Sequence, residues 1–84
     1  MMAKIFIYTL STCSHCRRAK EFLNEQGFDF EYIDVDLCEG DQRASTIEEV
    51  KKYNPRCTFP TLVIDEDTII VGFKETELRE ALGL

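Results

Sequence analysis

The sequence predicts a single α/β domain, residues 1–84, in which helices cover the faces of a mixed β-sheet. Two observations carry this prediction. Residues 4–37 show a strand pattern, a helix pattern and a second strand pattern, an order that requires parallel strands joined by a right-handed crossover. Residues 61–71 contain two short apolar runs that are close enough to pair only as antiparallel strands. The expected order of elements is therefore β-α-β-α-β-β-α.

Residues 4–9 form a nearly continuous run of β-branched and aromatic side chains, which predicts a central strand covered on both faces. Residues 9–12 then supply loop and capping residues. Apolar side chains recur at helical spacing after this loop, at Cys16, Ala19, Phe22 and Leu23. Gly27 offers a left-handed stop to this helix. Cys13 is therefore expected at the start of a helix.

Residues 28–37 contain the second expected strand. Its apolar residues Ile33, Val35 and Leu37 alternate with Asp34 and Asp36. Cys38 would then lie at the end of this strand, where we expect a passive thiol.

A second helix should follow the loop at residues 39–41 and end at Asn54 and Pro55. Its start has two interpretations. Ser45 and Glu48 would make a capping box, but Asp41 could cap a longer helix, and we favour the longer one. Its inward face would carry Ala44, Ile47 and Val50.

Residues 61–64 and 68–71 are short apolar strands separated by an acidic turn at residues 65–67, which predicts a hairpin. A last helix should run from about Lys74 or Glu75 to Leu82. Leu78, Ala81 and Leu82 would face inward, and Gly83 would end the helix.

The composition indicates the class of protein. The 84 residues carry a net charge of −6, which argues against nucleic acid or an anionic membrane as a partner. The longest apolar run near the start is too short for a signal peptide or a membrane span, so we expect a cytoplasmic protein with reduced thiols. We also expect it to act as a monomer. The basic residues Arg17, Arg18, Lys20, Arg56 and Lys74 would form a basic patch if their segments converge; otherwise they are scattered solvated charges.

The stretch "STCSHCRR", residues 11–18, carries the chemistry. A thiol attacks disulfides only as a thiolate, and a helix N-terminus and nearby positive charge both favour that form. Cys13 at the helix start has both, because Arg17 and Arg18 lie in the first turn. Cys16, one turn later on the apolar face, should stay a buried thiol. The spacing therefore makes the two sulfurs unequal, with Cys13 attacking and Cys16 resolving the mixed disulfide.

Other interpretations of the cysteine pair are weaker. A structural zinc site needs four ligands, usually in two pairs, whereas Cys38 and Cys57 are single and far apart in sequence. A structural disulfide across two residues closes a tiny loop and stabilises little. A Cys-x-x-Cys pair after the first strand of a β-α-β unit is typical of thioredoxin-like redox motifs.

Three segments together resemble the glutaredoxin family: "YTLSTCSHC", "TFPT" and "IIVGF", in this order, within a resemblance that covers residues 4–83. The resemblance implies a thioredoxin-like fold, a four-stranded mixed sheet flanked by three helices. It also implies a cis bond between Phe59 and Pro60, a proline that the sequence alone describes only as the entry to a strand. The residues that would contact glutathione or a substrate peptide are Thr12, Thr58, Phe59, Pro60, Gly72 and Phe73.

The resemblance implies no bound cofactor, with glutathione as a possible co-substrate and disulfide-containing proteins as partners. Leu10 stands where many family members have a lysine, and Gly72-Phe73 where many have Gly-Gly. The Gly-Phe form resembles glutaredoxin-like redoxins that a flavin-dependent thioredoxin reductase recycles. Glutathione and a flavin- or ferredoxin-linked reductase therefore both stay open as electron donors. The rival function is an iron–sulfur or metal binding module that uses Cys13, with a cluster shared between two subunits.

Ser14 and His15 replace the common Pro-Tyr between the cysteines and are expected to tune Cys13 together with Arg17. A histidine here resembles oxidising members of the thioredoxin superfamily. We therefore expect a reduction potential less negative than the roughly −270 mV of thioredoxin. The resemblance also places Cys57 in the loop that leads to Pro60, where it could be an alternative disulfide partner.

Overall fold

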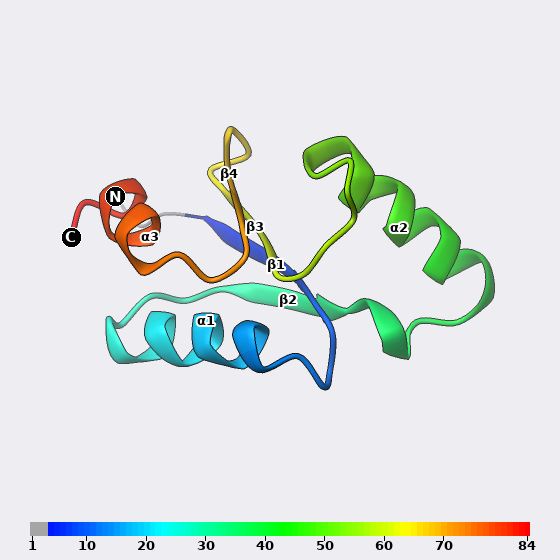
Figure 1. The fold of residues 1–84 in the computed structure, drawn as a ribbon, viewed down its shortest axis with the longest axis horizontal. Coiled ribbons are helices and arrows are strands. Elements are labelled where there is room, and N and C mark those ends of the chain that lie inside the picture. Colours follow the sequence, from blue (N-terminus) through cyan, green and yellow to red (C-terminus); the bar gives the residue numbers. More distant parts are fainter. Residues whose placement is uncertain (1–3) are drawn as a thin grey trace.

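The computed structural model describes residues 4–84 and has the predicted order of elements (Figure 1). The elements are β1 (Ile5–Thr9), α1 (Ser14–Glu25), β2 (Glu31–Asp34), the 3-10 turn η1 (Val35–Leu37), α2 (Gly40–Tyr53), β3 (Thr61–Ile64), β4 (Thr68–Val71) and α3 (Glu75–Ala81). The four strands form one sheet in the order β2-β1-β3-β4. β1 runs parallel to β2 and antiparallel to β3, and β3 and β4 form the hairpin. The mixed sheet with three helices is therefore confirmed.

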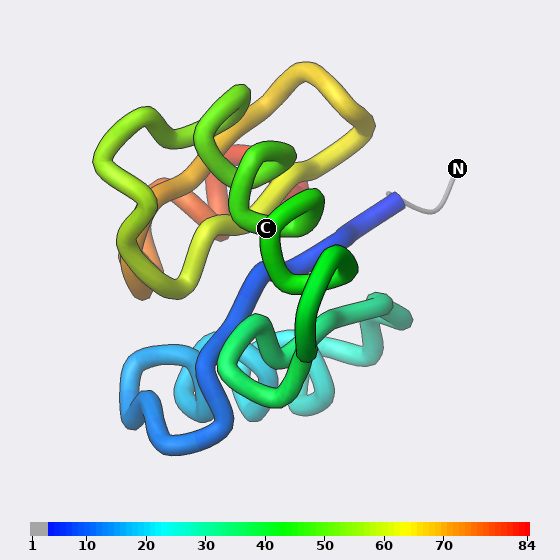
Figure 2. Tube along the Cα trace, turned by 90° about the vertical axis from the view of Figure 1, so that its right-hand side faces the viewer, coloured from blue at the N-terminus to red at the C-terminus, as the bar shows by residue number. Residues whose placement is uncertain are grey.

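Two apolar clusters fill the two sides of the sheet, and Figure 2 shows α1 and α2 on opposite sides of β1. The first cluster joins Ile5 and Ile7 of β1 to side chains of α1 and α3. The second joins Tyr8 and Val63 to Val50 of α2. Successive residues of a strand point to opposite faces, so β1 is covered on both of them, as predicted.

The second strand is shorter than the sequence pattern predicts. Pairing with β1 ends at Thr9 and Asp34, because β1 stops there and the chain turns toward α1. Without a partner strand, residues 35–37 form the turn η1, and Leu37 is 67% exposed. The expected strand position of Leu37 is therefore wrong, and Cys38 follows a 3-10 turn instead of ending a strand.

The longer version of the second helix is confirmed, since α2 begins at Gly40. The expected cap is wrong, because the N-cap residue is Glu39 and Asp41 lies in the first turn of the helix. The hydroxyl of Ser45 donates to the carbonyl of Gln42 and forms no cap. Ala44 is exposed, and the side chain buried near it is Thr46, whose hydroxyl also donates to Gln42. Ala81 is likewise exposed, because α3 is short and buries only Leu78. The expected inward orientation of both alanines is wrong; a methyl group gains little by burial.

One buried side chain organises the loop between α2 and β3. Asn54 is 4% exposed, and its Nδ2 lies 3.1 Å from the carbonyl oxygen of Thr58, 3.0 Å from Oγ1 of Thr58 and 3.1 Å from Oγ1 of Thr61. Its Oδ1 accepts a hydrogen bond from the N–H of Arg56 at 3.2 Å. The hydroxyl of Thr61 donates to the carbonyl of Thr58 at 2.7 Å. Asn54 therefore fixes the chain just before Phe59 and Pro60.

Among residues 4–84, no helix has the length and apolar character that crossing a membrane requires.

Replacing Asn54 by alanine should lower the free energy of unfolding by about 2 kcal/mol, because the substitution leaves buried partners without a donor. Urea unfolding followed by circular dichroism measures the change. Asn24→Ala is the matched control: Asn24 is exposed on α1, and its substitution should change the free energy by less than about 0.5 kcal/mol. Equal losses in the two variants would contradict the role given to Asn54.

Candidate active site

Cys13 is the N-cap residue of α1. Its Sγ accepts a hydrogen bond from the backbone N–H of Cys16 at 3.3 Å, and its own N–H donates to the carbonyl of Leu10 at 3.2 Å. The backbone of Cys13 is extended, as is usual at this position. The sulfur is half-buried and lies at the N-terminus of α1, where negative charge is favoured. The predicted place of Cys13 is confirmed.

Cys16 has a different environment. Its side chain is 1% exposed and lies on the apolar face of α1 with Ala19 and Leu23. Burial, and next the hydrogen bond with Cys13, raise the pKa of the Cys16 thiol to about 12. The two sulfurs are thus close together and unequal, in agreement with the sequence spacing.

The turn before Cys13 is held by a residue that the sequence did not single out. Asp36 of η1 accepts a hydrogen bond from the N–H of Ser11 at 2.9 Å, and its other oxygen accepts one from the hydroxyl of Ser11. The hydroxyl first, and then the N–H, lower the pKa of Asp36. In the sequence Asp36 looks like a solvent-facing residue of a strand. Its contact with Ser11 becomes visible only in the structure, where β2 ends at Asp34 and Asp36 lies in η1.

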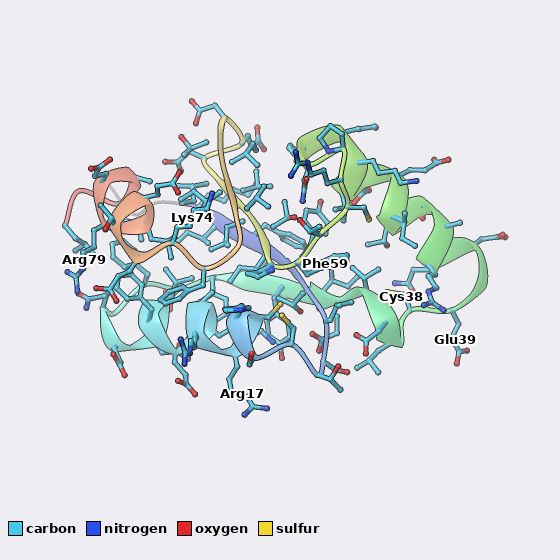
Figure 3. The ribbon with its side chains drawn as sticks, viewed as in Figure 1. Arg17, Cys38, Glu39, Phe59, Lys74 and Arg79 are labelled. Carbon is cyan, nitrogen blue, oxygen red and sulfur yellow. The ribbon has the colours of Figure 1, made fainter. Side chains whose placement is uncertain are left out.

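The loop that follows α2 lies beside Cys13. The carbonyl oxygen of Phe59 is 4.0 Å from Cys13 Sγ, and the bond between Phe59 and Pro60 is cis, as the resemblance implied. Figure 3 labels Phe59 above the start of α1. The buried Pro60 accepts a hydrogen bond at its carbonyl from the N–H of Gly72 at 2.8 Å. Gly72, with a φ of 83°, thereby joins the same region of the structure.

The remaining predicted site residues lie around this centre. Thr12, Ser14, His15 and Thr58 are exposed. Arg17 points away from the body of the molecule (Figure 3). The ring of Phe73 packs edge-on against Phe22, with 6.1 Å between the ring centres. It therefore contacts α1 at a residue that follows Cys13 and Cys16 along the helix.

Two of the basic residues that could contribute to a patch have acidic partners. Lys20 lies 3.8 Å from a carboxylate oxygen of Asp34, and Lys74 lies 3.5 Å from one of Glu77. Two of the five basic residues considered for the patch are therefore paired with carboxylates.

All four cysteines are free thiols. Cys38 is buried after η1, and its Sγ donates to the carbonyl oxygen of Asp34 at 3.7 Å. Cys57 is half-buried with a φ of 51° and packs against the cluster of Tyr8 and Val50. Within residues 4–84 of one chain, no group of three or more His, Cys, Asp or Glu side chains could hold a metal ion.

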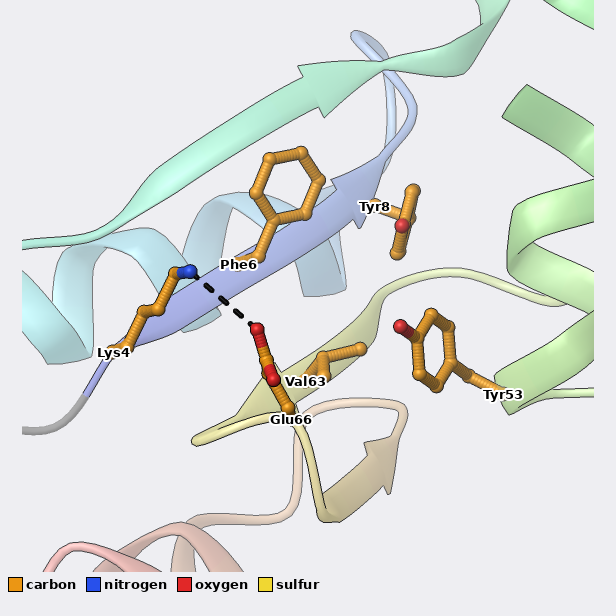
Figure 4. Close-up of a pocket in the computed structure, with 6 residues that line it drawn as sticks. All are labelled: Lys4, Phe6, Tyr8, Tyr53, Val63 and Glu66. Carbon is orange, nitrogen blue, oxygen red and sulfur yellow. Dashed lines mark ion pairs between the residues drawn. The ribbon is translucent and has the colours of Figure 1, made fainter. Parts of the chain in front are cut away.

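A separate cavity of about 150 Å³ lies on the α2 side of the sheet (Figure 4). Lys4, Phe6, Tyr8, Tyr53, Val63 and Glu66 line it. Lys4 and Glu66 form an ion pair at 3.6 Å at one end. Burial, and next the charge of Glu49, raise the pKa of Tyr8 to about 12. None of the cavity's lining residues is a cysteine, so it is no part of the thiol site.

Comparisons with known proteins give consistent results. The family model for glutaredoxin matches residues 5–69. The chain is 37% identical over 68 residues to glutaredoxin 3 of Escherichia coli, covering 81% of this chain and 76% of that protein. The crystal structure of methanoredoxin from Methanosarcina acetivorans has a TM-score of 0.91 and 46% identity, over 96% of this chain and 85% of that one.

A longer relative matches only in part. Glutathione S-transferase Z2 of Arabidopsis thaliana is 43% identical over 67 residues, which are 80% of this chain but 27% of that protein. The fold, the family model and the two relatives matched over 76% and 85% of their own length agree with one another. The chain therefore belongs to the glutaredoxin family of the thioredoxin superfamily.

Proposed function

We propose that this protein is a glutaredoxin-like thiol–disulfide oxidoreductase that reduces protein or glutathione mixed disulfides through Cys13 and Cys16. It would act as an electron carrier in cell redox homeostasis. The observation that carries the proposal is the position of Cys13 Sγ at the N-terminus of α1, 3.3 Å from the N–H of Cys16, with the Cys16 thiol buried behind it. An accessible sulfur beside a buried one is the arrangement that a two-step exchange needs.

In the first step, the thiolate of Cys13 attacks one sulfur of the substrate disulfide. The substrate S–S bond breaks, one substrate thiolate leaves, and a mixed disulfide forms on Cys13. In the second step, the sulfur of Cys16 attacks Cys13, and the second substrate sulfur leaves and takes up the proton lost by Cys16. The substrate is reduced, and Cys13 and Cys16 are oxidised to a disulfide.

The substrate would bind along the loop that contains Phe59 and Pro60. Three contacts support this: Phe59 lies beside Cys13 Sγ, Asn54 fixes Thr58, and Gly72 is hydrogen-bonded to Pro60. An extended peptide can pair with main-chain groups of such a loop. Thr12 and Phe73 would complete the contact surface. The protein would work as a cytoplasmic monomer without a resident cofactor, with disulfide-containing proteins as partners and neither nucleic acid nor membrane.

The electron donor is identified by measuring how fast each of three systems reduces the oxidised protein. The systems are glutathione with glutathione reductase, thioredoxin reductase, and a ferredoxin-linked reductase. Leu10 brings no positive charge to the turn before Cys13, and its side chain packs against the cluster of Tyr8 and Val35. We therefore propose that glutathione is the weakest of the three donors. A stoichiometric iron–sulfur cluster in anaerobically purified protein would favour the rival binding function instead.

Cys13→Ser should reduce the turnover of a glutathionylated peptide to background, because the attacking thiol is lost. Cys16→Ser should still form a mixed disulfide on the remaining thiol of the pair but should not resolve it, so this species accumulates and is detected by intact mass. Cys38→Ser, at a buried thiol after η1, is the control and should keep the wild-type rate. Persistent turnover in Cys13→Ser would disprove the proposed mechanism.

Leu10→Lys should raise the rate at which glutathione reduces the oxidised protein by about threefold, the effect of one exposed ion pair with a glutathione carboxylate. Coupled oxidation of a nicotinamide cofactor by glutathione reductase measures this rate. Leu84→Lys adds the same charge at an exposed position after α3 and should have no effect. A similar increase in both variants would mean that net charge alone is responsible.

His15→Tyr should make the reduction potential of the Cys13–Cys16 pair more negative, by on the order of 30 mV. The reason is that an exposed imidazole between the cysteines can carry a positive charge, which would stabilise the thiolate of the reduced form. The phenol of a tyrosine carries no positive charge. Equilibration with glutathione buffers measures the potential. An unchanged value would remove His15 from the residues that tune the site.

A further inference from the structure

In the proposed exchange, no group has yet been assigned that favours the thiolate of Cys16 in the resolving step. Cys16 must lose its proton before its sulfur can attack Cys13, because only the thiolate is nucleophilic. Yet Cys16 is 1% exposed, and burial is the main reason that its pKa is about 12. A positive charge near this sulfur would favour the thiolate during the resolving step.

Lys20 is placed to supply that charge. It lies four residues after Cys16 on α1, so the two side chains share one face of the helix. Its Nζ is 3.8 Å from Oδ1 of Asp34 and 3.8 Å from the centre of the Tyr32 ring. The side chains of Lys20 and Asp34 are only 24% and 18% exposed. The ammonium group is therefore held in a partly shielded place beside β2, where its charge is screened less than on an open surface.

Asp34 is itself fixed at the junction of β1 and β2. The fully buried Thr9 has its Oγ1 within hydrogen-bond distance of the Asp34 carboxylate and 3.1 Å from the carbonyl of Ile33. Cys13 raises the pKa of the Cys16 thiol, and the positive charge of Lys20 lowers it. Asp34 and Tyr32 face Lys20 from β2 and hold it in place.

We propose that Lys20, anchored by Asp34, is a positioning residue that stabilises the thiolate of Cys16 while the mixed disulfide is resolved. This inference rests on the proposed dithiol function. The Cys16 sulfur attacks Cys13, the bond from Cys13 to the substrate sulfur breaks, and the leaving substrate thiolate takes up the proton that Cys16 gave to the surrounding water. Lys20 transfers no proton and contributes its charge only.

The aromatic disulfide dithiobis(nitrobenzoate) separates the two steps. Attack by Cys13 releases one coloured thiolate, and resolution by Cys16 releases a second from the mixed disulfide. All proteins carry Cys57→Ser, so that this half-buried thiol adds no signal. Stopped-flow absorbance records both phases in the full-length chain.

Lys20→Met should slow the second release roughly tenfold, the effect of losing one partly shielded charge near the reacting sulfur, and should leave the first release unchanged. Lys20→Arg keeps the charge and should restore most of the rate. Lys51→Met removes an exposed lysine of α2 and should change neither phase. Urea unfolding checks that each variant is folded. If Lys20→Met does not fold, Lys20→Gln serves as the uncharged variant with the same expectation.

A wild-type second phase in the folded, uncharged variant would overturn the inference, and so would a Lys20→Arg protein that is as slow as Lys20→Met. Failure of the proposed function looks different. In that case the first phase would persist after Cys13→Ser, whatever residue occupies position 20.

Discussion

Burial of β1 on both of its faces is the constraint on which the rest of the structure depends. Ile5 and Ile7 pack with α1 and α3, whereas Phe6 and Tyr8 pack on the side of α2. A shift of one residue would exchange these two sets and bury each in the wrong layer. The carboxyl end of β1 is therefore fixed in place, and the short turn after it sets where Cys13 stands at the start of α1.

Around this fixed point, hydrogen bonds hold three loops that are distant in sequence. Asp36 holds the turn at Ser11, Asn54 holds the chain at Thr58, and the N–H of Gly72 reaches Pro60. Each such bond adds little net stability, but a buried group that loses its partner costs more than the bond is worth. Apolar packing thus fixes the sheet and the helices, and polar contacts fix the loops that form the site on them.

This division explains what the sequence could predict. Strong local patterns predicted β1, α1, the hairpin and the N-terminal position of Cys13, and the resemblance to glutaredoxins supplied the cis bond before Pro60. The end of β2 was missed because Val35 and Leu37 continue the strand pattern, while the pairing itself stops at Asp34.

The polar contacts had no comparable sequence signal. Asn54 and Asp36 are ordinary loop and strand residues until the fold brings Thr58, Thr61 and Ser11 to them. Partners of this kind depend on tertiary register and not on local propensity. The roles proposed for the exposed residues Ser14 and His15 rest on the family resemblance and on their place between the two sulfurs.

The burial of Cys16 also imposes an order on the chemistry. In the proposed exchange, a sulfur that is protonated and hidden from solvent cannot compete for the substrate, so the half-buried Cys13 would react first. Once the mixed disulfide exists, the attack by Cys16 is intramolecular, and proximity compensates for a small fraction of thiolate. The same burial that makes Cys16 a poor nucleophile toward free disulfides therefore suits it to the second step. In our proposal, the fixed charge of Lys20 lowers the free energy of the Cys16 thiolate enough for this step to proceed.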